Sequence, residues 1–334
     1  MHCSKMSVRT KRRPVTPPHC ILSARIRTTR GALVHWASKP NHWRQAQQHY
    51  PFGAVKSTSH AAHLCAHLLR HFLTTASWRP RSFVRANRYD LHVPMSDVLH
   101  MSIKRPHTPV VTLVRGLVNQ KKHSCMVDFA NRHVGGAYLS GGFVQEEKLV
   151  LERFEMATLL AKACAEGRPL TMNSTQVWVF RGVHKWATCD EYGSITADWK
   201  THTRTHRTGG NPMTIIAMDA LPINPAVPYT IQHISWLLAK AYTGFAAARR
   251  DGQRHIATGN WGCGIFGNCP YVIFWIQCLA AYMADVYLTY YSHRVHLKPA
   301  YQQWDTWVAE SNTYADIWQC IQRHLQMRNM SRCR

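Results

Sequence analysis

Short segments with the character of β-strands alternate along this chain with longer segments that have helical periodicity. Strands, rich in β-branched and aromatic residues, are expected at 109–114, 124–129, 176–180, 214–216, 255–258 and 286–290. Helices are expected at 149–165, 231–248, 271–283 and 313–325. Strands separated by helical segments are typical of a layered α/β domain. We therefore expect an α/β fold.

The stretch at 127–147 combines a strand, a glycine loop and two carboxylates. Asp128 and Asn131 stand where the apolar strand ends. Asp and Asn favour strand ends and turns, because their side chains can satisfy nearby backbone groups. Glycine pairs at 135–136 and 141–142 let the backbone approach a ligand closely. Glu146 and Glu147 follow near the start of the next helix. The arrangement suits acid–base chemistry on a sugar or diphosphate, although glutamate at a helix start also occurs simply because it complements the helix dipole.

A second glycine stretch, at 257–267, lies between the strand at 255–258 and the helix at 271–283. Successive backbone amides in such a loop can bind a diphosphate. The spacing Gly262-x-Gly264-x-x-Gly267, followed by Asp285, also satisfies the dinucleotide-binding fingerprint. That fingerprint normally opens the first strand–helix unit of its domain, whereas this match comes near the end of the chain.

The beginning of the chain is basic. The 334 residues carry a formal net charge of +24, and no acidic residue precedes Asp90. Residues 1–55 lack a clear apolar period, so we expect a disordered or targeting segment. An acid-free, Arg-rich start is typical of a mitochondrial transit peptide, the run Lys11-Arg12-Arg13 fits nuclear import equally well, and a wrongly assigned gene start would look the same. The charge predicts weak attraction to polyanions, or simply a solvated tail.

A helix is expected at 60–75, where Leu64, Leu68 and Phe72 form an apolar stripe beside a face rich in histidine. Metal binding there is a weaker interpretation than a His-rich face without a ligand, because a closed metal site usually takes ligands from several elements. No Cys-x-x-Cys pair occurs, and the scattered thiols fit a reducing compartment. No apolar run of eighteen residues occurs, so no membrane span is predicted.

Taken in order, the two glycine stretches resemble the signature of poly(ADP-ribose) glycohydrolases of the macrodomain type. The matching strings are Val-Asp-Phe-Ala-Asn at 127–131, Gly-Gly-Ala at 135–137, Gln-Glu-Glu at 145–147 and Ala-Thr-Gly-Asn-Trp-Gly-Cys-Gly at 257–264. The resemblance covers roughly residues 124–290. The chain departs from the family pattern at Ala137, where the family has glycine, and at 268–270, where Asn-Cys-Pro replaces a glycine and the residues after it.

The resemblance implies a three-layer macrodomain-like fold, with a central mixed sheet between helices and a small helical accessory region before it. The domain boundaries that we expect on this basis are a basic segment at 1–55, the helical accessory region at 56–108 and the catalytic domain at 109–328.

The resemblance also implies hydrolysis of the ribose–ribose O-glycosidic bonds of poly(ADP-ribose) within the DNA damage response. The expected location is the nucleus or cytoplasm, and the acid-free, Arg-rich N-terminus makes the mitochondrion a further candidate. Glu147 would be the general acid and base, Glu146 would orient the ribose, and Asp128 would hold the loop or the catalytic glutamate. The residues implied in substrate binding are Asn131, Gly135, Gly136, Ala137, Gln145, Tyr192, Gly262, Gly264, Ile265 and Phe266. The implied partners are poly(ADP-ribose) and ADP-ribosylated proteins, and neither a metal nor a cofactor is needed.

Two alternatives stay open. A macrodomain could bind ADP-ribose without turnover, and the late glycine fingerprint could belong to a nicotinamide-dependent oxidoreductase. Retention of both Glu146 and Glu147 favours the hydrolase over the binding module, because a protein that only binds ADP-ribose has no need of two glutamates.

Overall fold

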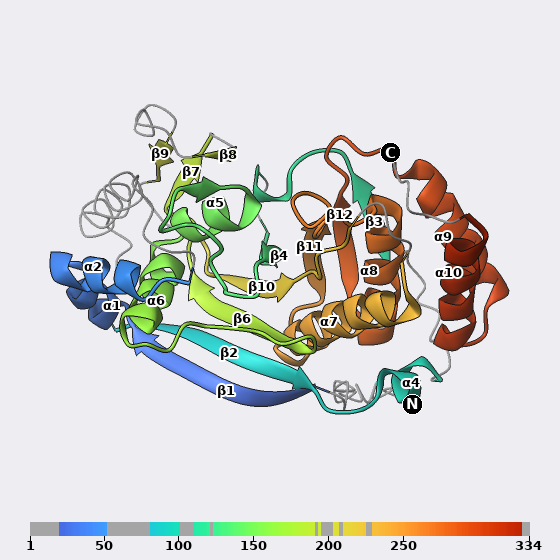
Figure 1. Ribbon diagram of the computed structural model, residues 1–334, viewed down its shortest axis with the longest axis horizontal. Coiled ribbons are helices and arrows are strands. Elements are labelled where there is room, and N and C mark those ends of the chain that lie inside the picture. Colours follow the sequence, from blue (N-terminus) through green and yellow to red (C-terminus); the bar gives the residue numbers. More distant parts are fainter. Residues whose placement is uncertain are drawn as a thin grey trace, which may run out of the picture.

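The structure, a computed structural model, describes residues 20–51, 81–100, 110–120, 123–190, 193–194, 203–206, 210–224 and 229–328 (Figure 1). The strands of its large sheet are β1 (Cys20–Thr29), β2 (Phe83–Leu91), β3 (Val111–Val114), β4 (Cys125–Ala130), β6 (Gln176–Val183), β10 (Met213–Asp219), β11 (His255–Gly259) and β12 (Tyr287–Tyr291). They are ordered β1-β2-β6-β10-β4-β11-β12-β3. Two small pairs are formed by β5 (Gly142–Phe143) with β8 (Gly193–Ser194), and by β7 (Ala187–Cys189) with β9 (Thr203–Thr205).

The large sheet is mixed, and its direction places the two glycine loops together. Strands β10, β4, β11, β12 and β3 run parallel, whereas β1, β2 and β6 are paired antiparallel. The carboxyl ends of the parallel strands therefore meet at one edge. Because β4 lies directly beside β11, the loop after β4 and the loop after β11 emerge next to each other, where ligands bind in open α/β sheets.

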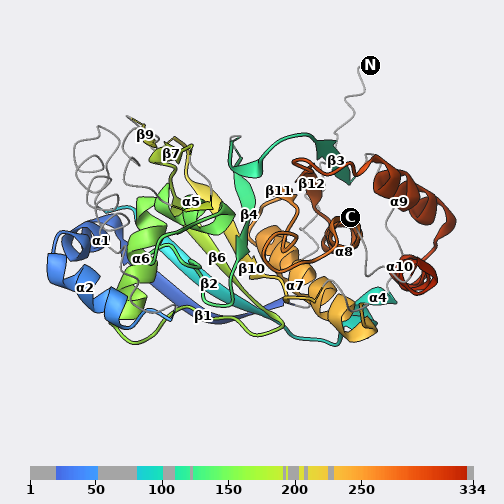
Figure 2. The same ribbon diagram turned by 45° about the horizontal axis from the view of Figure 1, so that its top comes forward.

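Helices cover both faces of the sheet and form two hydrophobic cores (Figures 1 and 2). One core contains α7 (Ile231–Arg250), α8 (Pro270–Ala284), α9 (Lys298–Glu310) and α10 (Tyr314–Arg328), with the short helix α4 (Met95–Leu99) beside α10. The other contains α1 (Arg30–Ala37), α2 (Pro40–Gln48), α5 (Gln145–Leu151) and α6 (Phe154–Ala165). On β4, Val127 points to the first core and Met126 to the second, so central strands are apolar on both faces. None of the described helices has the length and apolar character needed to cross a membrane.

The α/β fold and the strands and helices predicted between 109 and 328 are confirmed, with one difference. The helix expected at 149–165 begins earlier, at Gln145, and breaks into α5 and α6. Arg153 at the break has φ −124° and ψ 87°, outside the helical region. Tertiary contacts cause the break: Glu152 accepts a hydrogen bond from the Cys189 amide (2.9 Å) and pairs with Lys185 (3.0 Å). These contacts join residues more than thirty positions apart, so the helical periodicity of the sequence cannot predict them.

Residues 20–48, expected to be disordered or a targeting segment, instead form β1, α1 and α2, and β2 lies in the range expected to be a helical accessory region. β1 pairs with β2 and β2 with β6, so both strands extend the large sheet. Along β1, Ala24 and Ile26 pack inward and alternate with the exposed Arg25 and Arg27, which is a strand pattern that the sequence analysis overlooked. The helix predicted at 60–75 and Tyr192 lie outside the described residues.

A buried ion pair fastens this N-terminal segment to the rest of the fold. Arg30, the first residue of α1, lies 3.1 Å from the Glu155 carboxylate of α6, and both side chains are buried. Arg30 also donates to the Gly182 carbonyl (3.2 Å), and the Trp186 indole N–H donates to Glu155 (2.7 Å). Because both charges are out of water, loss of either would leave the other unpaired in the core.

Replacing Arg30 tests this attachment. We expect Arg30→Met to lower the free energy of unfolding by about 3–5 kcal/mol, because the buried Glu155 carboxylate loses its guanidinium partner and retains, among the described residues, only Trp186 and His184. A matched control is Arg168→Met, which breaks a pair with Glu166 in which Arg168 is 78% exposed and should cost about 0–1 kcal/mol. Urea unfolding of both variants measures the difference, and equal losses would contradict the assignment.

Candidate active site

The loop after β4 is folded around the two glutamates at the start of α5. The Glu146 carboxylate accepts hydrogen bonds from the amides of Asn131 (2.8 Å) and Gly135 (2.6 Å). The Glu147 carboxylate accepts from the amides of Ala137 (2.8 Å) and Val144 (3.0 Å). The two side chains are only 3% and 5% exposed. Each carboxylate thus joins two separate points of the loop, and the four amides compensate for the burial of the charges.

Glycine is required where the loop meets these carboxylates. Gly135 and Gly136 have φ +106° and +51°, and a Cβ on Gly136 would lie 2.3 Å from Glu147 Oε1 and 2.5 Å from Glu146 Oε2. Ala137 is unstrained, since Asp285 and His293 are the non-glycine residues with positive φ in the described part of the chain. Its methyl group occupies space that Gly142 leaves open, because a Cβ on Gly142 would lie 2.6 Å from it.

Asp128 lies near the end of β4, fully buried below the loop. Burial, and then the charge of Glu147, raise its pKa well above the usual range, while Arg153 opposes the shift. Neither of its oxygens has a hydrogen-bond partner among the described residues. The sequence predicted that Asp128 holds the loop or the catalytic glutamate, and the structure shows only electrostatic proximity to Glu147.

Glu146 completes a group of three carboxyls that share one buried site. Its pKa is raised well above the usual range by burial, then by Asp128 and Glu147, and the amides of Gly135 and Asn131 oppose the shift. Burial together with the neighbouring carboxyls therefore favours the protonated forms of Asp128 and Glu146.

Gln145, predicted to bind substrate, has its side chain engaged within the protein. Its Oε1 accepts from the Phe129 amide (2.8 Å), and its Nε2 donates to Asn119 Oδ1 and the Val127 carbonyl, both at 3.2 Å. Gln145 therefore clamps the start of α5 to β4. Asn131 uses its Oδ1 to accept from the His133 amide (3.1 Å), which shapes the turn that follows β4.

The loop after β11 presents backbone donors beside this site. Within the described part of the chain, the amides of Gly262, Gly264, Ile265 and Phe266 donate to no protein acceptor. A Cβ on Gly262 would lie 2.3 Å from that of Ala220, whereas one on Gly264 would meet nothing within 4 Å. Ile265 is 84% exposed. Four amides without a protein acceptor on one short loop are what an anion-binding site would need, and diphosphate binding there stays a prediction.

Asn268 holds this loop in place through its side chain. In the sequence it stood out only as a departure from the family pattern. Its Nδ2 donates to the carbonyls of Leu221 (2.9 Å) and Gly262 (3.1 Å), and its Oδ1 accepts from the Tyr229 hydroxyl (3.1 Å). Helix α8 begins at Pro270, after the last glycine. In the dinucleotide fingerprint the motif itself opens the helix, so the structure does not support that alternative.

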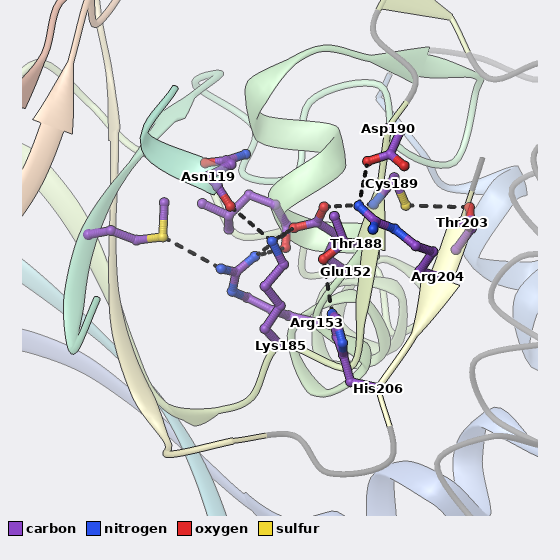
Figure 3. Close-up of polar contacts among 12 residues, drawn as sticks. Asn119, Glu152, Arg153, Lys185, Thr188, Cys189, Asp190, Thr203, Arg204 and His206 are labelled. Carbon is purple, nitrogen blue, oxygen red and sulfur yellow. Dashed lines mark hydrogen bonds and ion pairs between the residues drawn. The ribbon is translucent and has the colours of Figure 1, made fainter. Parts of the chain in front are cut away.

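A buried cation that the sequence analysis missed lies beneath α5 (Figure 3). Arg153 donates to the Leu149 carbonyl (2.9 Å) and lies 3.6 Å from Glu152, toward which Lys185 also points (3.0 Å). Lys185 further donates to the Asn119 carbonyl (2.9 Å), next to the Gln145 clamp. The one sequence signal was a charged pair, Glu-Arg at 152–153, inside an apolar helical run.

Gly136→Ala tests the close approach of the loop to the carboxylates. Its control is Gly167→Ala, at φ +67° with nothing within 4 Å of the new Cβ. Both variants should lose roughly 1–2 kcal/mol of the free energy of unfolding, because alanine is strained in a left-handed conformation. Gly136→Ala should lose about 1–3 kcal/mol more, because both carboxylates must move. Equal losses in urea unfolding would show that the contact is not tight.

The chain is similar to known proteins of one family. The family model described as "Poly (ADP-ribose) glycohydrolase (PARG), Macro domain fold" matches residues 99–298. A crystal structure of poly(ADP-ribose) glycohydrolase from Thermomonospora curvata aligns over 72% of this chain and 96% of its own, at 16% identity and a TM-score of 0.45. The same enzyme with the inhibitor ADP-HPD aligns over equal shares, at 17% identity and a TM-score of 0.43. The enzyme from Deinococcus radiodurans in complex with ADP-ribose aligns over 58% of this chain and 83% of its own, at 17% identity and a TM-score of 0.38. The match to the family model spans more than half of the chain, which therefore belongs to the poly(ADP-ribose) glycohydrolase catalytic-domain family, with the macrodomain fold.

Proposed function

We propose that this protein hydrolyses the ribose–ribose O-glycosidic bonds of poly(ADP-ribose) and releases ADP-ribose. One observation carries the proposal: a pair of buried glutamates held by a glycine loop lies next to a second loop with four free amides. The first loop offers a carboxyl for acid–base chemistry, and the second offers donors for a diphosphate. Membership of the family supports the same reaction.

The chemistry of the bond assigns the steps. Cleavage passes through an oxocarbenium-like state, in which the leaving ribose oxygen needs a proton and a water must then attack the anomeric carbon. In the proposed reaction Glu147 donates its proton to the leaving oxygen as the glycosidic bond breaks. The Glu147 carboxylate then accepts a proton from the attacking water, which restores the starting state. The amides of Ala137 and Val144 hold the carboxylate in place throughout.

Other residues position the substrate in this proposal. Glu146 and Asn131 bind the terminal ribose, and Gly135, Gly136 and Ala137 form the wall against which it lies. The free amides of Gly262, Gly264, Ile265 and Phe266 bind the diphosphate.

Asp128 influences the reaction only through its charge and proton, because it makes no hydrogen bond to the described loop. Tyr192 stays a prediction for stacking on the adenine. ADP-ribosylated proteins as partners, a role in the DNA damage response, and a nuclear, cytoplasmic or mitochondrial location also stay predictions.

A module that binds ADP-ribose without turnover is the alternative, since the same two loops would serve binding alone. The burial of Glu146 and Glu147 favours the hydrolase, because two carboxylates in a binding pocket cost desolvation that a simple reader has no reason to retain. Release of free ADP-ribose from automodified polymer distinguishes the two functions directly.

Glu147→Gln and Glu146→Gln form a matched pair that tests the mechanism. In each variant the new side-chain amide faces one loop N–H that previously donated to a carboxylate oxygen, so the structural disturbance is similar. Glu147→Gln should retain ADP-ribose binding and lose at least about a hundredfold in hydrolysis. Glu146→Gln should lose hydrolysis together with affinity.

Hydrolysis and ADP-ribose affinity of both variants are measured side by side. Near-parental hydrolysis by Glu147→Gln would refute the proposed mechanism. If the parent and both variants bind but none hydrolyses polymer, the protein is a binding module.

Gly264→Val tests the diphosphate loop. A Cβ at this position meets no protein atom within 4 Å, and the residue does not have positive φ, so the variant should fold normally. Its side chain would project among the free amides and should abolish the thermal stabilisation that ADP-ribose gives to the parent. A variant that unfolds at the parental temperature and still binds ADP-ribose with parental affinity would show that the diphosphate lies elsewhere.

A further inference from the structure

A tyrosine from the N-terminal segment reaches the glycine loop of the candidate active site. Tyr50 follows α2, outside the residues 99–298 that the family model matches. Its buried hydroxyl donates to the carbonyl of Gly136. Its ring lies edge-to-face against Tyr138, with the centroids 5.7 Å apart. Residues 86 positions apart are thus joined at the loop that holds the catalytic glutamate.

The carbonyl that Tyr50 holds belongs to the peptide group that contacts Glu147. The carbonyl of Gly136 and the N–H of Ala137 form one planar trans peptide, so they point in opposite directions. The Ala137 N–H donates to Glu147 Oε1 at 2.8 Å. Tyr50 and Glu147 therefore bind opposite edges of the same peptide group, Tyr50 at its carbonyl and Glu147 at its N–H.

We propose that Tyr50 is a positioning residue for Glu147, which acts by fixing the orientation of the Gly136–Ala137 peptide. The proposal rests on the function proposed above for Glu147. It adds to the active site a residue from a part of the chain that lies before the matched family domain.

The peptide needs to be fixed because a glycine precedes it. Gly136 has positive φ, and rotation about its ψ, which turns this peptide, meets little steric resistance in glycine. A flipped peptide would turn the Gly136 carbonyl toward Glu147 and the Ala137 N–H away from it. The carboxylate would then face an oxygen instead of a donor. The Tyr50 hydroxyl stabilises the unflipped orientation, and a hydrogen bond to the carbonyl also polarises the N–H on the other side.

The hydroxyl is suited to act as a constant donor. Burial, and then the charges of Glu146, Cys164 and Glu147, raise the pKa of Tyr50 well above its usual value, against the opposing effect of the Leu139 backbone amide. Burial is the main cause that keeps the phenol protonated, and the nearby acidic groups add to it.

The segment that carries Tyr50 is itself held in place. In α2, Ala46 is fully buried in the core that also contains α6, and the Trp43 indole donates to the Ala37 carbonyl at 2.9 Å. The hydroxyl is therefore presented to the loop by packed structure.

Tyr50→Phe in the full chain tests the proposal, with Tyr314→Phe as its matched control. Tyr314 is also buried and donates its hydroxyl to a backbone carbonyl, that of Tyr282 (3.3 Å), but on α10 and away from the loop. Phenylalanine at 50 retains the ring that packs on Tyr138, so the fold should be kept. Three quantities are measured for each variant: kcat and KM on polymer, ADP-ribose affinity, and hydrogen exchange of the Ala137 amide by NMR.

Tyr50→Phe should lower kcat on the order of ten- to a hundredfold, because a misplaced catalytic group costs about that much. KM and ADP-ribose affinity should change little, and the Ala137 amide should exchange faster. Tyr314→Phe should leave kcat and the exchange of Ala137 at parental values. An equal fall of kcat in both variants would overturn the proposal, as would a lower kcat with unchanged exchange of Ala137.

The exchange measurement separates this proposal from the proposed function. If the parent does not hydrolyse polymer, the proposed function fails, and the exchange of Ala137 still decides whether Tyr50 orients the peptide. Faster exchange in Tyr50→Phe alone supports that role, and unchanged exchange overturns it.

Discussion

The hydrogen bonds between two buried carboxylates and four loop amides are the interaction on which the rest of the site depends. Glu146 and Glu147 each bind two amides that lie several residues apart, so the loop after β4 closes around them. Hydrogen bonds of this kind, between N–H groups and a charged acceptor, are among the strongest in proteins. The loop can make them only because Gly136 carries no Cβ where both carboxylates pass. The backbone conformation and the position of the acidic groups therefore determine each other.

Among the described residues, the carboxyl groups around this loop outnumber the cations that face them. Asp128, Glu146 and Glu147 share a buried region, and Arg153 opposes the pKa shift of Asp128 from below α5. Burial, more than mutual repulsion, raises the pKa of Asp128 and Glu146 well above the usual range, and strongly shifted carboxyls often mark functional sites. Ordinary structural carboxylates are found at the surface or fully paired. Neither oxygen of the buried Asp128 has a hydrogen-bond partner among the described residues, so this carboxyl is not held as ordinary structural carboxyls are.

The N-terminal segment completes the half of the molecule that carries this site. β1 extends the sheet beyond β2, and Arg30 joins α1 to Glu155 on α6, the helix that follows α5. Tyr50 then reaches the loop itself. The loop after β4 is thereby supported by β4 itself, by the Gln145 clamp at the start of α5, and by the N-terminal segment through Tyr50.

Periodicity and motif spacing were sufficient to predict the α/β class, most elements between 109 and 328, and the two loops that the parallel strands bring together. These features depend on residues near one another in the chain, where alternation, glycine and helix-start preferences leave a readable pattern. Sequence reasoning assigned Gln145 to substrate and treated Asn268 as a mere departure, and it could not detect Tyr50 or Arg153. β1 was missed although Ala24 and Ile26 alternate with Arg25 and Arg27, because the basic, acid-free composition of the N-terminal segment favoured a disordered or targeting segment. The sequence by itself thus determined which residues have side chains suited to acid–base chemistry and ligand binding. Only the tertiary structure decided which side chains are engaged in holding the loop. That choice depends on contacts between residues far apart in the chain, which leave no local signal.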